Sequence, residues 1–553
     1  MFKLNPLTAI DSYKLAHRAA YPEGTAEVYS NFTPRSVKHL NVDPKYKTDE
    51  IVWFGGQAVI KDMVDLWNEE FFFKEQFNPA LSDYVKRVAP FAGSDYSVKH
   101  LQKLYELGYL PLEIKVLPEG SRVSVGVPVL TIRNTHPEFF WLTNYLETAL
   151  SAEMWKMSTS ATIADYYRKI IENWAEITGG NKDFIDFQAH DFSARGMSNM
   201  MDAAKSGAGH LLSFKGSDTI SAVDYLAYHY DGDNTFVAAS VPATEHSIQC
   251  AYADDYEYIK KLVTEIYPTG IVSVVSDGYD YWNVILNILP KLKDEILARP
   301  VNEFGMSKVV IRPDSGDPVR IICGYNYLTA VDVIDLENQC DVLYTNDKLH
   351  TADQVVKMTD GRFYKFEVEY YRDADGVRSV EIGEEIPEHI VMGSVQCLWD
   401  TFGGTVNNKG FATLDSHIGL IYGDSITLAR AEEILKRLSA RGFASDNIVF
   451  GVGSYTYQYN TRDTLGFAMK ATNIVVNGKD MPLWKDPKTD DGTKRSAKGL
   501  LFVYAHVGTG KLTCQDQMTR RYERGGELKT IFLDGKMVNT KTLEEIRLKL
   551  KNG

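Results

Sequence analysis

The sequence predicts an α/β protein with an irregular (β/α) barrel domain, because short apolar runs alternate with amphipathic stretches along the middle of the 553-residue chain. The apolar runs span residues 271–275, 309–311, 418–422 and 448–450, and the amphipathic stretches span 279–297 and 426–439. Short continuous apolar strands separated by helices are typical of a parallel sheet that is buried on both faces. If such a sheet curls into a barrel, its functional residues lie at the carboxyl ends of the strands.

The two ends of the chain follow another pattern. Residues 112–133 alternate around Pro-Glu-Gly and Gly-Val-Pro turns, which indicates antiparallel strands, and residues 138–174 have a helical pattern. We therefore expect a mixed α+β domain formed from both termini, residues 1–150 with 462–553, and a barrel-like catalytic domain over 151–461.

An insertion over 320–392 interrupts the barrel. Its alternating runs around Asp373-Ala374-Asp375-Gly376 predict a β-hairpin, and such an insertion is more often a solvated surface element than a catalytic part.

Composition narrows the class of protein. A net charge of −14 and a pI of about 5.4 argue against non-specific nucleic-acid binding, although a local basic pocket can still bind phosphates. The five cysteines are scattered without a C-x-x-C pair, which argues against a disulfide framework and fits a reducing compartment. We find no apolar signal-peptide core and no run approaching the ~20 residues of a membrane span. We expect a cytoplasmic protein that binds neither nucleic acid nor membrane.

Charged residues follow the runs 271–275, 309–311 and 418–422, and they also follow a further apolar run at 237–241. These are the positions where a barrel would place its functional site. Each of these residues alone could simply cap the next helix. Four such ends would converge on one face, however, and carboxylates beside Arg312 and His246 would suit a polyhydroxyl, polyphosphate ligand with Mg²⁺, which prefers oxygen ligands. The segments are Pro242-Ala243-Thr244-Glu245-His246, Ser276-Asp277-Gly278, Arg312-Pro313-Asp314 and Gly423-Asp424-Ser425.

Two further groups of residues could bind an aromatic or an anionic ligand. Phe192 stands three residues before Arg195, and Asp218 ends a Phe-Lys-Gly-Ser-Asp segment, although a Phe and an Arg are more often core and surface residues. The turn at 451–453 (Gly-Val-Gly) is a weak phosphate-loop signal. A basic series near the C-terminus is by spacing alone usually a solvated face, and it comprises Arg462, Lys470, Lys485, Lys494, Arg495 and Lys498.

Together these segments resemble the nicotinamide phosphoribosyltransferase family, which are type II phosphoribosyltransferases, in one order over nearly the whole chain except the insertion. The resemblance implies transfer of the 5-phosphoribosyl group of phosphoribosyl pyrophosphate to nicotinamide, giving nicotinamide mononucleotide and pyrophosphate in NAD salvage. It also implies Mg²⁺ as cofactor, ATP as an activating co-substrate, and a homodimer with its sites at the interface. The matching segments are AIDSYK at 9–14, HDFSARG at 190–196, FKGSDT at 214–219, SVPATEHS at 240–247, VSVVSDGYD at 272–280, IRPDSGDP at 311–318, YGDS at 422–425, TRD at 461–463 and KDPKTDDGTKRSAKG at 485–499.

The resemblance also implies a role for individual residues. Phe192 and Tyr13, the latter from the second subunit, would sandwich the pyridine ring, with Arg195 near it and Asp218 accepting from the carboxamide. ATP would phosphorylate His246, supported by Asp277. Arg312, Asp314 and Asp424 would hold ribose, pyrophosphate and the Mg²⁺ shell, with Asp277 and Asp314 reaching the metal through phosphates or water. Further substrate contacts would come from Ser240, Val241, Ala243, Gly423 and Gly453 and from the second subunit's basic residues at positions Arg35, Arg462, Lys470, Lys485 and Lys494.

Two alternatives stay open: the sister activity on nicotinate, and a non-catalytic binding or signalling protein on the same fold. An ionised Asp218 would accept a hydrogen bond from a neutral carboxamide and would repel the carboxylate of nicotinate, which favours nicotinamide. A metal-dependent hydrolase is disfavoured because the sequence has no H-x-x-x-H or comparable ligand set. The chain departs from the family at 451–455, where a glycine run is usual, and at Ala468, where serine is common. Whether the insertion forms a rim near the site or a dimer contact is open.

Overall fold

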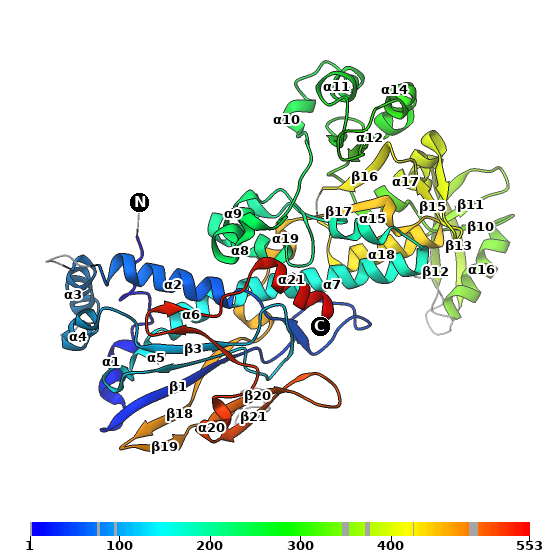
Figure 1. The fold of residues 1–553 in the computed structure, drawn as a ribbon. Coiled ribbons are helices and arrows are strands. Elements are labelled where there is room, and N and C mark those ends of the chain that lie inside the picture. Colours follow the sequence, from blue (N-terminus) through cyan, green and yellow to red (C-terminus); the bar gives the residue numbers. More distant parts are fainter. Residues whose placement is uncertain are drawn as a thin grey trace. The chain divides into compact units, whose positions relative to one another are not determined.

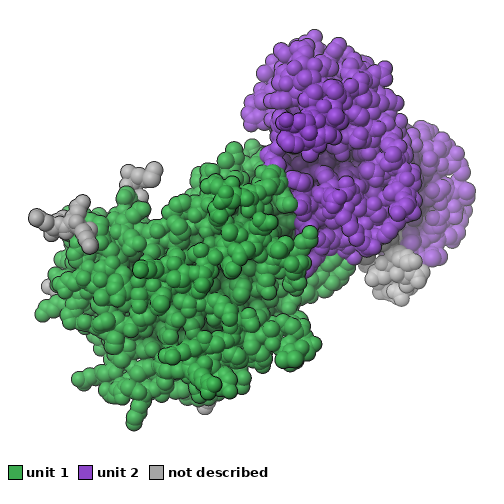
Figure 2. Space-filling view, viewed as in Figure 1, with its two compact units in different colours: residues 1–166, 193–238, 457–553 green, residues 167–192, 239–456 purple. Residues whose placement is uncertain are grey.

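The computed structural model describes residues 3–73, 78–92, 97–345, 353–370, 376–423, 425–485 and 496–553. The chain forms two compact units (Figure 2). Unit 1 comprises residues 1–166, 193–238 and 457–553, and unit 2 comprises residues 167–192 and 239–456. The domains expected from the sequence differ from these units chiefly in residues 193–238, which belong to unit 1. None of the helices in the described ranges has the length and apolar character needed to cross a bilayer.

Unit 2 is built on a curled parallel sheet (Figure 1). The strands β8 and β16 are buried along their whole length, as expected for strands covered on both faces. The predicted α/β class with an irregular, barrel-like parallel sheet is therefore confirmed. In spatial order the paired strands are β6 (Ala189–Asp191), β17 (Ile448–Val452), β16 (Ile418–Tyr422), β9 (Val309–Arg312) and β8 (Val272–Val275).

Helices follow the strands of unit 2 where the amphipathic stretches predict them. The stretch 426–439 forms α18 (Leu428–Ala440), which buries Leu428, Ala431 and Leu435 on one face. The stretch 279–297 forms a series of short turns that includes a π-helical segment, α12 (Tyr281–Asn283), η6 (Val284–Ile288), α13 (Leu289–Lys291) and α14 (Lys293–Leu297). Further helices of unit 2 include α10 (His246–Gln249), α11 (Asp255–Lys261), η5 (Leu262–Ile266), α15 (Pro318–Cys323) and α17 (Glu388–Phe402).

The run 237–241 is not a strand, and the expectation of a strand there was wrong. A single isolated bridge, between Ala243 and Ser273, joins the following segment to β8. Pro242 has no N–H to donate to a ladder, and its carbonyl accepts from the Ser273 N–H at 2.8 Å. The segment therefore passes along β8 without continuous pairing, yet it still brings the residues after Ala243 to the end of that strand.

Unit 1 combines segments from both ends of the chain in a seven-stranded sheet. The predicted antiparallel strands in 112–133 are confirmed, because β3 pairs with β5, while β4 (Arg122–Ser124) pairs instead with β2 (Glu50–Val52). The sheet order is β19 (Lys479–Pro482), β18 (Ala468–Val476), β1 (Thr25–Thr33), β5 (Leu130–Asn134), β3 (Leu112–Val116), β22 (Lys529–Leu533) and β23 (Lys536–Met537). Strands β20 (Leu500–Ala505) and β21 (Leu512–Met518) form a separate antiparallel pair in the same unit.

The helical pattern over 138–174 corresponds to α5 (Leu142–Tyr145), α6 (Glu147–Glu153) and α7 (Trp155–Thr178), the last of which runs from unit 1 into unit 2. Helix α19 (Ser454–Gln458) likewise joins the two units. The remaining helices of unit 1 are α1 (Lys14–Ala20), α2 (Gly56–Glu70), α3 (Pro79–Ala92), α4 (Lys99–Leu107), α8 (Met200–His210), α9 (Ile220–Tyr230), α20 (Arg520–Glu523) and α21 (Leu543–Asn552).

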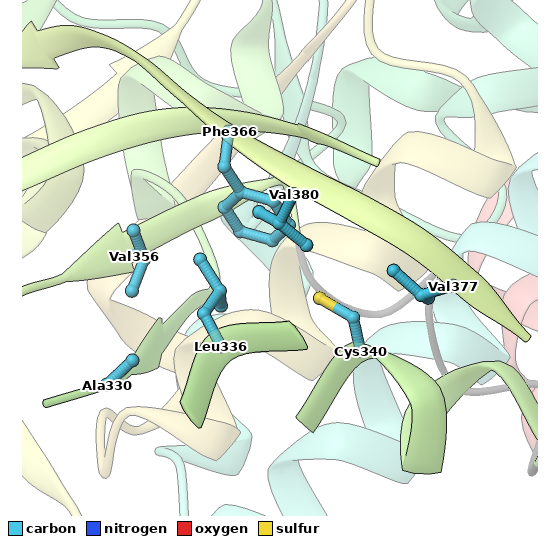
Figure 3. Close-up of a cluster of buried hydrophobic side chains, with 7 residues drawn as sticks. All are labelled: Ala330, Leu336, Cys340, Val356, Phe366, Val377 and Val380. Carbon is cyan, nitrogen blue, oxygen red and sulfur yellow. The ribbon is translucent and has the colours of Figure 1, made fainter. Parts of the chain in front are cut away.

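The insertion forms a small sheet with a core of its own. Strands β12 (Phe363–Tyr370) and β13 (Val377–Ile386) pair antiparallel, as the alternation predicts, although turn residues 373–375 lie outside the described residues. Strand β11 (Val355–Lys357) pairs with β12 and, in parallel, with β10 (Tyr327–Thr329), and α16 (Val333–Thr345) packs on the sheet. The core between them (Figure 3) consists of Ala330, Leu336, Cys340, Val356, Phe366, Val377 and Val380.

Candidate active site

The ends of β8 and β9 bring the predicted catalytic residues of unit 2 together. Asp277 follows β8, and Asp314 follows β9 by two residues. The backbone N–H of Asp314 donates to Asp277 Oδ2 at 2.9 Å, and the Ser315 hydroxyl donates to the same oxygen at 2.6 Å. The other oxygen, Asp277 Oδ1, lies 3.0 Å from His246 Nε2. Neighbouring parallel strands end at the same edge of the sheet, which accounts for this convergence.

Asp277 is a buried carboxylate that its neighbours keep ionised. Its side chain is 3% exposed. Burial raises its pKa, but the hydrogen bonds from Ser315, from the Asp314 N–H and from His246 outweigh burial and hold the pKa below the ordinary value of an aspartate. An ionised Asp277 both orients the imidazole of His246 and stabilises positive charge on it.

His246 is the first residue of α10, and its side chain is 46% exposed. A histidine with one ring nitrogen on a buried carboxylate and with an accessible ring is suited to proton transfer or to nucleophilic attack. The three candidates before it, which lie in the segment along β8, are the exposed Ser240 and Ala243 and the half-buried Val241.

Arg312 ends β9 and points part of its guanidinium into the protein. Its Nη2 donates to the carbonyl oxygen of Thr244, and its Nε is buried with no hydrogen-bond partner among the described residues. Gly423, at the end of β16, lies beside it, since a Cβ there would come within 2.7 Å of Asp314 Oδ1 and 3.2 Å of Arg312 Nη1. A side chain at position 423 would therefore displace both charged groups. Asp424 lies outside the described residues.

Phe192 follows β6 and is half-buried. Its N–H donates to the carbonyl oxygen of Val452 at 3.0 Å, and its ring centroid lies 4.7 Å from that of His190. A Cβ on Gly451 would come within 2.8 Å of Phe192 Cδ2, so glycine at 451 makes room for the ring. Gly453 directly follows β17, and its carbonyl oxygen accepts from the Thr456 N–H at 3.2 Å.

Other candidates lie in unit 1, and Tyr13 is the aromatic residue among them. Tyr13 is the N-cap residue of α1, is 57% exposed, and has its ring centroid 5.2 Å from that of His17. Its neighbours are firmly held, because the Thr148 hydroxyl donates to Asp11 Oδ2 at 2.7 Å and Lys14 Nζ lies 2.5 Å from Glu147 Oε2. The Tyr13 ring is therefore exposed to solvent, while the residues on either side of it are held by hydrogen bonds and an ion pair.

Four basic candidates of unit 1 are near enough to influence one another. Partial burial lowers the pKa of Lys470, and the positive charges of Arg35, Lys485 and Arg462 lower it further, while Glu147 opposes them. Arg35 is fixed by its Nε, which donates to the Gly466 carbonyl oxygen at 2.8 Å. A group of mutually repelling cations favours an anionic ligand. Lys494 lies outside the described residues.

The two candidates for recognition of the base substituent also belong to unit 1. Asp218 follows β7 (Gly216–Ser217) and precedes α9, and Arg195 lies in the short helix η3 (Ala194–Gly196). Both side chains are exposed. Phe192, by contrast, belongs to unit 2.

Sequence reasoning missed three residues that hold the strand-end groups in place. Ser315 donates to Asp277, and the Tyr422 hydroxyl donates to the carbonyl oxygens of Ser315 and Gly316 at 2.8 and 3.0 Å. Thr244 Oγ1 accepts from the Val275 N–H at 3.0 Å and lies 2.5 Å from the hydroxyl of Tyr258, whose pKa burial raises to about 12. All three stand within the segments quoted above, so a polar residue adjoining a predicted catalytic residue was the available signal.

Comparison with known proteins gives matches over most of the chain. The protein-family model described as the nicotinate phosphoribosyltransferase (NAPRTase) family matches residues 187–526, and the nicotinamide phosphoribosyltransferase N-terminal domain matches residues 5–75. The nicotinamide phosphoribosyltransferase of Acinetobacter baylyi is 46% identical over 99% of this chain and 97% of its own length. That of Mycoplasma pneumoniae is 32% identical over 90% and 95%. Among solved structures, human nicotinic acid phosphoribosyltransferase has a TM-score of 0.47 and 13% identity, covering 98% of this chain and 93% of that chain.

Proposed function

This chain belongs to the nicotinate phosphoribosyltransferase family, and we propose that it transfers the 5-phosphoribosyl group of phosphoribosyl pyrophosphate to nicotinamide. The products are nicotinamide mononucleotide and pyrophosphate, a step of NAD salvage that we expect in the cytoplasm. The observation that carries the proposal is the 46% identity with the A. baylyi nicotinamide phosphoribosyltransferase along nearly the whole of both chains. Mass-spectrometric detection of nicotinamide mononucleotide from the purified protein tests it, and its absence would refute it.

The proposed reaction needs positioning and charge stabilisation more than proton transfer. The pyridine nitrogen of nicotinamide uses its lone pair to form a bond to ribose C1, while the bond from C1 to the pyrophosphate oxygen breaks. Because no proton leaves the nitrogen, no strong general base is required. Phe192 and Tyr13 would hold the ring in line with C1. Arg312, with its buried unpartnered Nε, and the basic residues around Lys470 would stabilise the leaving pyrophosphate.

We propose Mg²⁺ as the cofactor, with Asp314 as the carboxylate that reaches it. Both oxygens of Asp277 already accept or face hydrogen-bonding groups of the protein, whereas the Asp314 carboxylate accepts none from the described residues. Within the described ranges no group of three His, Cys, Asp or Glu residues could hold a metal unaided, which suits a Mg²⁺ bound mainly through substrate phosphates. When bound, Mg²⁺ would neutralise charge on the departing pyrophosphate.

We propose that ATP activates the enzyme by phosphorylating His246. Because Nε2 lies against Asp277, the other ring nitrogen, Nδ1, is the nucleophile: a P–N bond forms to the γ-phosphorus while the bond to the ADP oxygen breaks. Asp277 stabilises the imidazolium that develops. His246→Ala should abolish stimulation by ATP while nicotinamide mononucleotide still forms without ATP. Stimulation that survives in His246→Ala would rule out this role.

The preference for nicotinamide over nicotinate is proposed to depend on Asp218. The exposed carboxylate would accept from the neutral carboxamide and repel nicotinate. Asp218→Asn should therefore reduce the ratio of kcat/KM for nicotinamide to that for nicotinate by about tenfold or more, a change of roughly 1.4 kcal/mol per factor of ten. Asp224→Asn, which changes an exposed aspartate in the helix that follows Asp218, α9, is the matched control. An unchanged ratio in Asp218→Asn, or a wild type that prefers nicotinate, would overturn the assignment.

We propose a homodimer in which each site takes Tyr13 and the basic residues from the second subunit. Tyr13→Ala and Arg312→Ala should each be inactive alone. After mixing and subunit exchange, roughly a quarter of wild-type activity should return, because half of the dimers are mixed and each has one intact site. As the control, each variant is taken through the same exchange procedure without the other, and no activity should return. No recovery from subunits shown to have exchanged would refute sharing.

A further inference from the structure

The helix that carries His246 has little packing of its own. Helix α10 is four residues long, and Gln249, which is 1% exposed, is its only buried residue. His246, Ser247 and Ile248 are all exposed. A single turn of helix is unstable in water, because fixing its backbone is compensated by very few hydrogen bonds. Contacts from outside α10 must therefore hold His246 in place.

The side chain of Gln249 supplies such contacts on both sides of its amide. Its Oε1 accepts from the backbone N–H of Gly278 at 3.0 Å, and its Nε2 donates to Asp255 Oδ1 at 2.8 Å. Gly278 directly follows Asp277, and Asp255 is the buried first residue of α11. One buried amide thus links α10 both to the residue beside Asp277 and to the next helix.

These bonds close a ring around the His246–Asp277 pair. Asp277 is fixed on one side by Ser315 and by the Asp314 N–H. On the other side its neighbour Gly278 is tied to Gln249, which lies three residues after His246. The 3.0 Å separation of His246 Nε2 and Asp277 Oδ1 closes the ring. If the Gln249 amide is lost, the contacts left to position the imidazole are the backbone of α10, the contacts of Thr244 two residues before His246, and the contact with Asp277 itself.

We propose that Gln249 is the positioning residue that holds the His246 imidazole against Asp277. The functional consequence, control of His246 phosphorylation, rests on the role proposed above for His246. The geometric consequence does not rest on it, because a displaced imidazole changes its reactivity towards any electrophile. Gln249 itself touches neither substrate nor the reacting atoms.

The experiment compares Gln249→Met with Gln396→Met. Methionine has nearly the length of glutamine and lacks both polar functions. Gln396 lies on α17 of the same unit and donates through its Nε2 to Asp400 Oδ1 at 2.8 Å. Its loss removes an amide-to-carboxylate bond of the same length, at a more exposed position far along the chain from His246. The first readout is the rate at which diethyl pyrocarbonate modifies His246, measured on the His246 peptide by mass spectrometry. We expect that rate to change about threefold or more in Gln249→Met and to stay at the wild-type value in Gln396→Met.

The second readout is the rate at which ATP phosphorylates His246. A displacement of about 1 Å costs on the order of 100-fold in a positioned reaction, so we expect a loss of that size in Gln249→Met. The loss of ATP-dependent turnover should also exceed any loss of ATP-independent turnover, with the change in kcat rather than in the KM for nicotinamide. Gln396→Met should match the wild type in both.

A second pair of variants separates positioning from general loss of stability. In Gln249→Glu the introduced carboxylate faces the carboxylate of Asp255 and cannot donate to it, so we expect a defect similar to that of Gln249→Met. In the double variant Gln249→Glu, Asp255→Asn the hydrogen bond re-forms in the opposite direction, and His246 reactivity and phosphorylation should return to within about threefold of wild type. Thermal melting of each variant is recorded in parallel.

Three results would overturn the inference: unchanged His246 reactivity in Gln249→Met, an equal change in Gln396→Met, or a double variant that regains its melting temperature without regaining His246 reactivity. Failure of the proposed function has a different signature. A wild type that forms no nicotinamide mononucleotide, or takes no phosphate on His246, would refute those proposals while the reactivity of His246 still tests Gln249.

Discussion

The candidate residues of unit 2 and those of unit 1 are held in different ways. In unit 2 the side chains bond to one another, as Asp277 does with Ser315 and His246, and the central carboxylate is buried. In unit 1 the side chains of Tyr13 and Asp218 are exposed, and what is fixed near Tyr13 is its neighbour Asp11, which accepts from Thr148. The unit 2 group forms without help from a ligand, whereas the unit 1 group remains accessible.

This difference indicates what each group needs from its ligand. Asp277 has its pKa lowered by partners that the fold already provides. Lys470 has its pKa lowered by burial and by like charges, so an arriving anion would relieve a repulsion that the fold leaves in place. We infer that unit 2 supplies preorganised geometry and that unit 1 supplies attraction for the phosphates.

The largest expected effect is a loss of kcat when a residue of the preorganised unit 2 group, Arg312, is replaced. Arg312→Ala removes a cation whose position is fixed by the Thr244 carbonyl, and we expect kcat to fall by about 10²–10³-fold. Arg320→Ala, in the exposed part of α15 in the same unit, is the matched control and should leave kcat near the wild-type value. Steady-state kinetics with both substrates measures the effect. A change in KM alone would mean that Arg312 attracts the substrate, as proposed for the basic residues of unit 1, and would contradict the difference between the two units.

A smaller effect should follow from crowding the ring of Phe192. Gly451→Ala places a methyl group 2.8 Å from Phe192 Cδ2 and 2.4 Å from the Tyr422 carbonyl oxygen, so the ring or the strand must shift. We expect the KM for nicotinamide to rise by about fivefold, since one misplaced stacking partner costs roughly 1 kcal/mol. Gly383→Ala in β13 meets its nearest atom only at 3.5 Å and serves as the control. Unaltered nicotinamide kinetics in Gly451→Ala would remove Phe192 from base binding.

The third effect concerns stability and its dependence on pH. Because the pKa of Asp277 is lower in the folded than in the unfolded protein, its contribution is complete above the ordinary value near 3.8 and is lost as the pH falls through the lowered folded value. At pH 7, Asp277→Asn should lower the free energy of unfolding by about 1–3 kcal/mol. Urea titrations should show this difference shrinking below about pH 4. A difference that persists undiminished in acid would mean that the hydrogen bonds of Asp277 do not depend on its charge.

The sequence predicts the sheet of unit 2 well because its signal is local. The runs 271–275, 309–311, 418–422 and 448–450 correspond to β8, β9, β16 and β17, since continuous burial on both faces leaves a continuous apolar run. The run 237–241 misled for the same reason: it is apolar, but Pro242 prevents a ladder from forming. An apolar run predicts that a segment is buried. Pairing with a neighbouring strand also requires backbone N–H donors, and proline has none.

The parts that could not be predicted depend on contacts between distant segments. Nothing in Thr25–Thr33 indicates that this strand pairs with Ala468–Val476 on one side and Leu130–Asn134 on the other. The same holds for the hydrogen bonds from Ser315 and Gln249, which are polar residues of ordinary type until the fold brings Asp277 and Gly278 beside them. The family motifs located the candidates but gave no information on which residues hold them.

The insertion begins and ends at one point of unit 2. The Tyr325 N–H donates to the Val391 carbonyl oxygen at 3.0 Å, and the Arg441 guanidinium binds the carbonyl oxygens of Tyr325, Val391 and Met392, so one side chain joins both ends. With a separate core and adjacent ends, this segment has the properties of a replaceable cassette. We expect the parallel sheet to accept modules of other length and sequence here, which offers protein engineers a position for a reporter or a second catalytic domain.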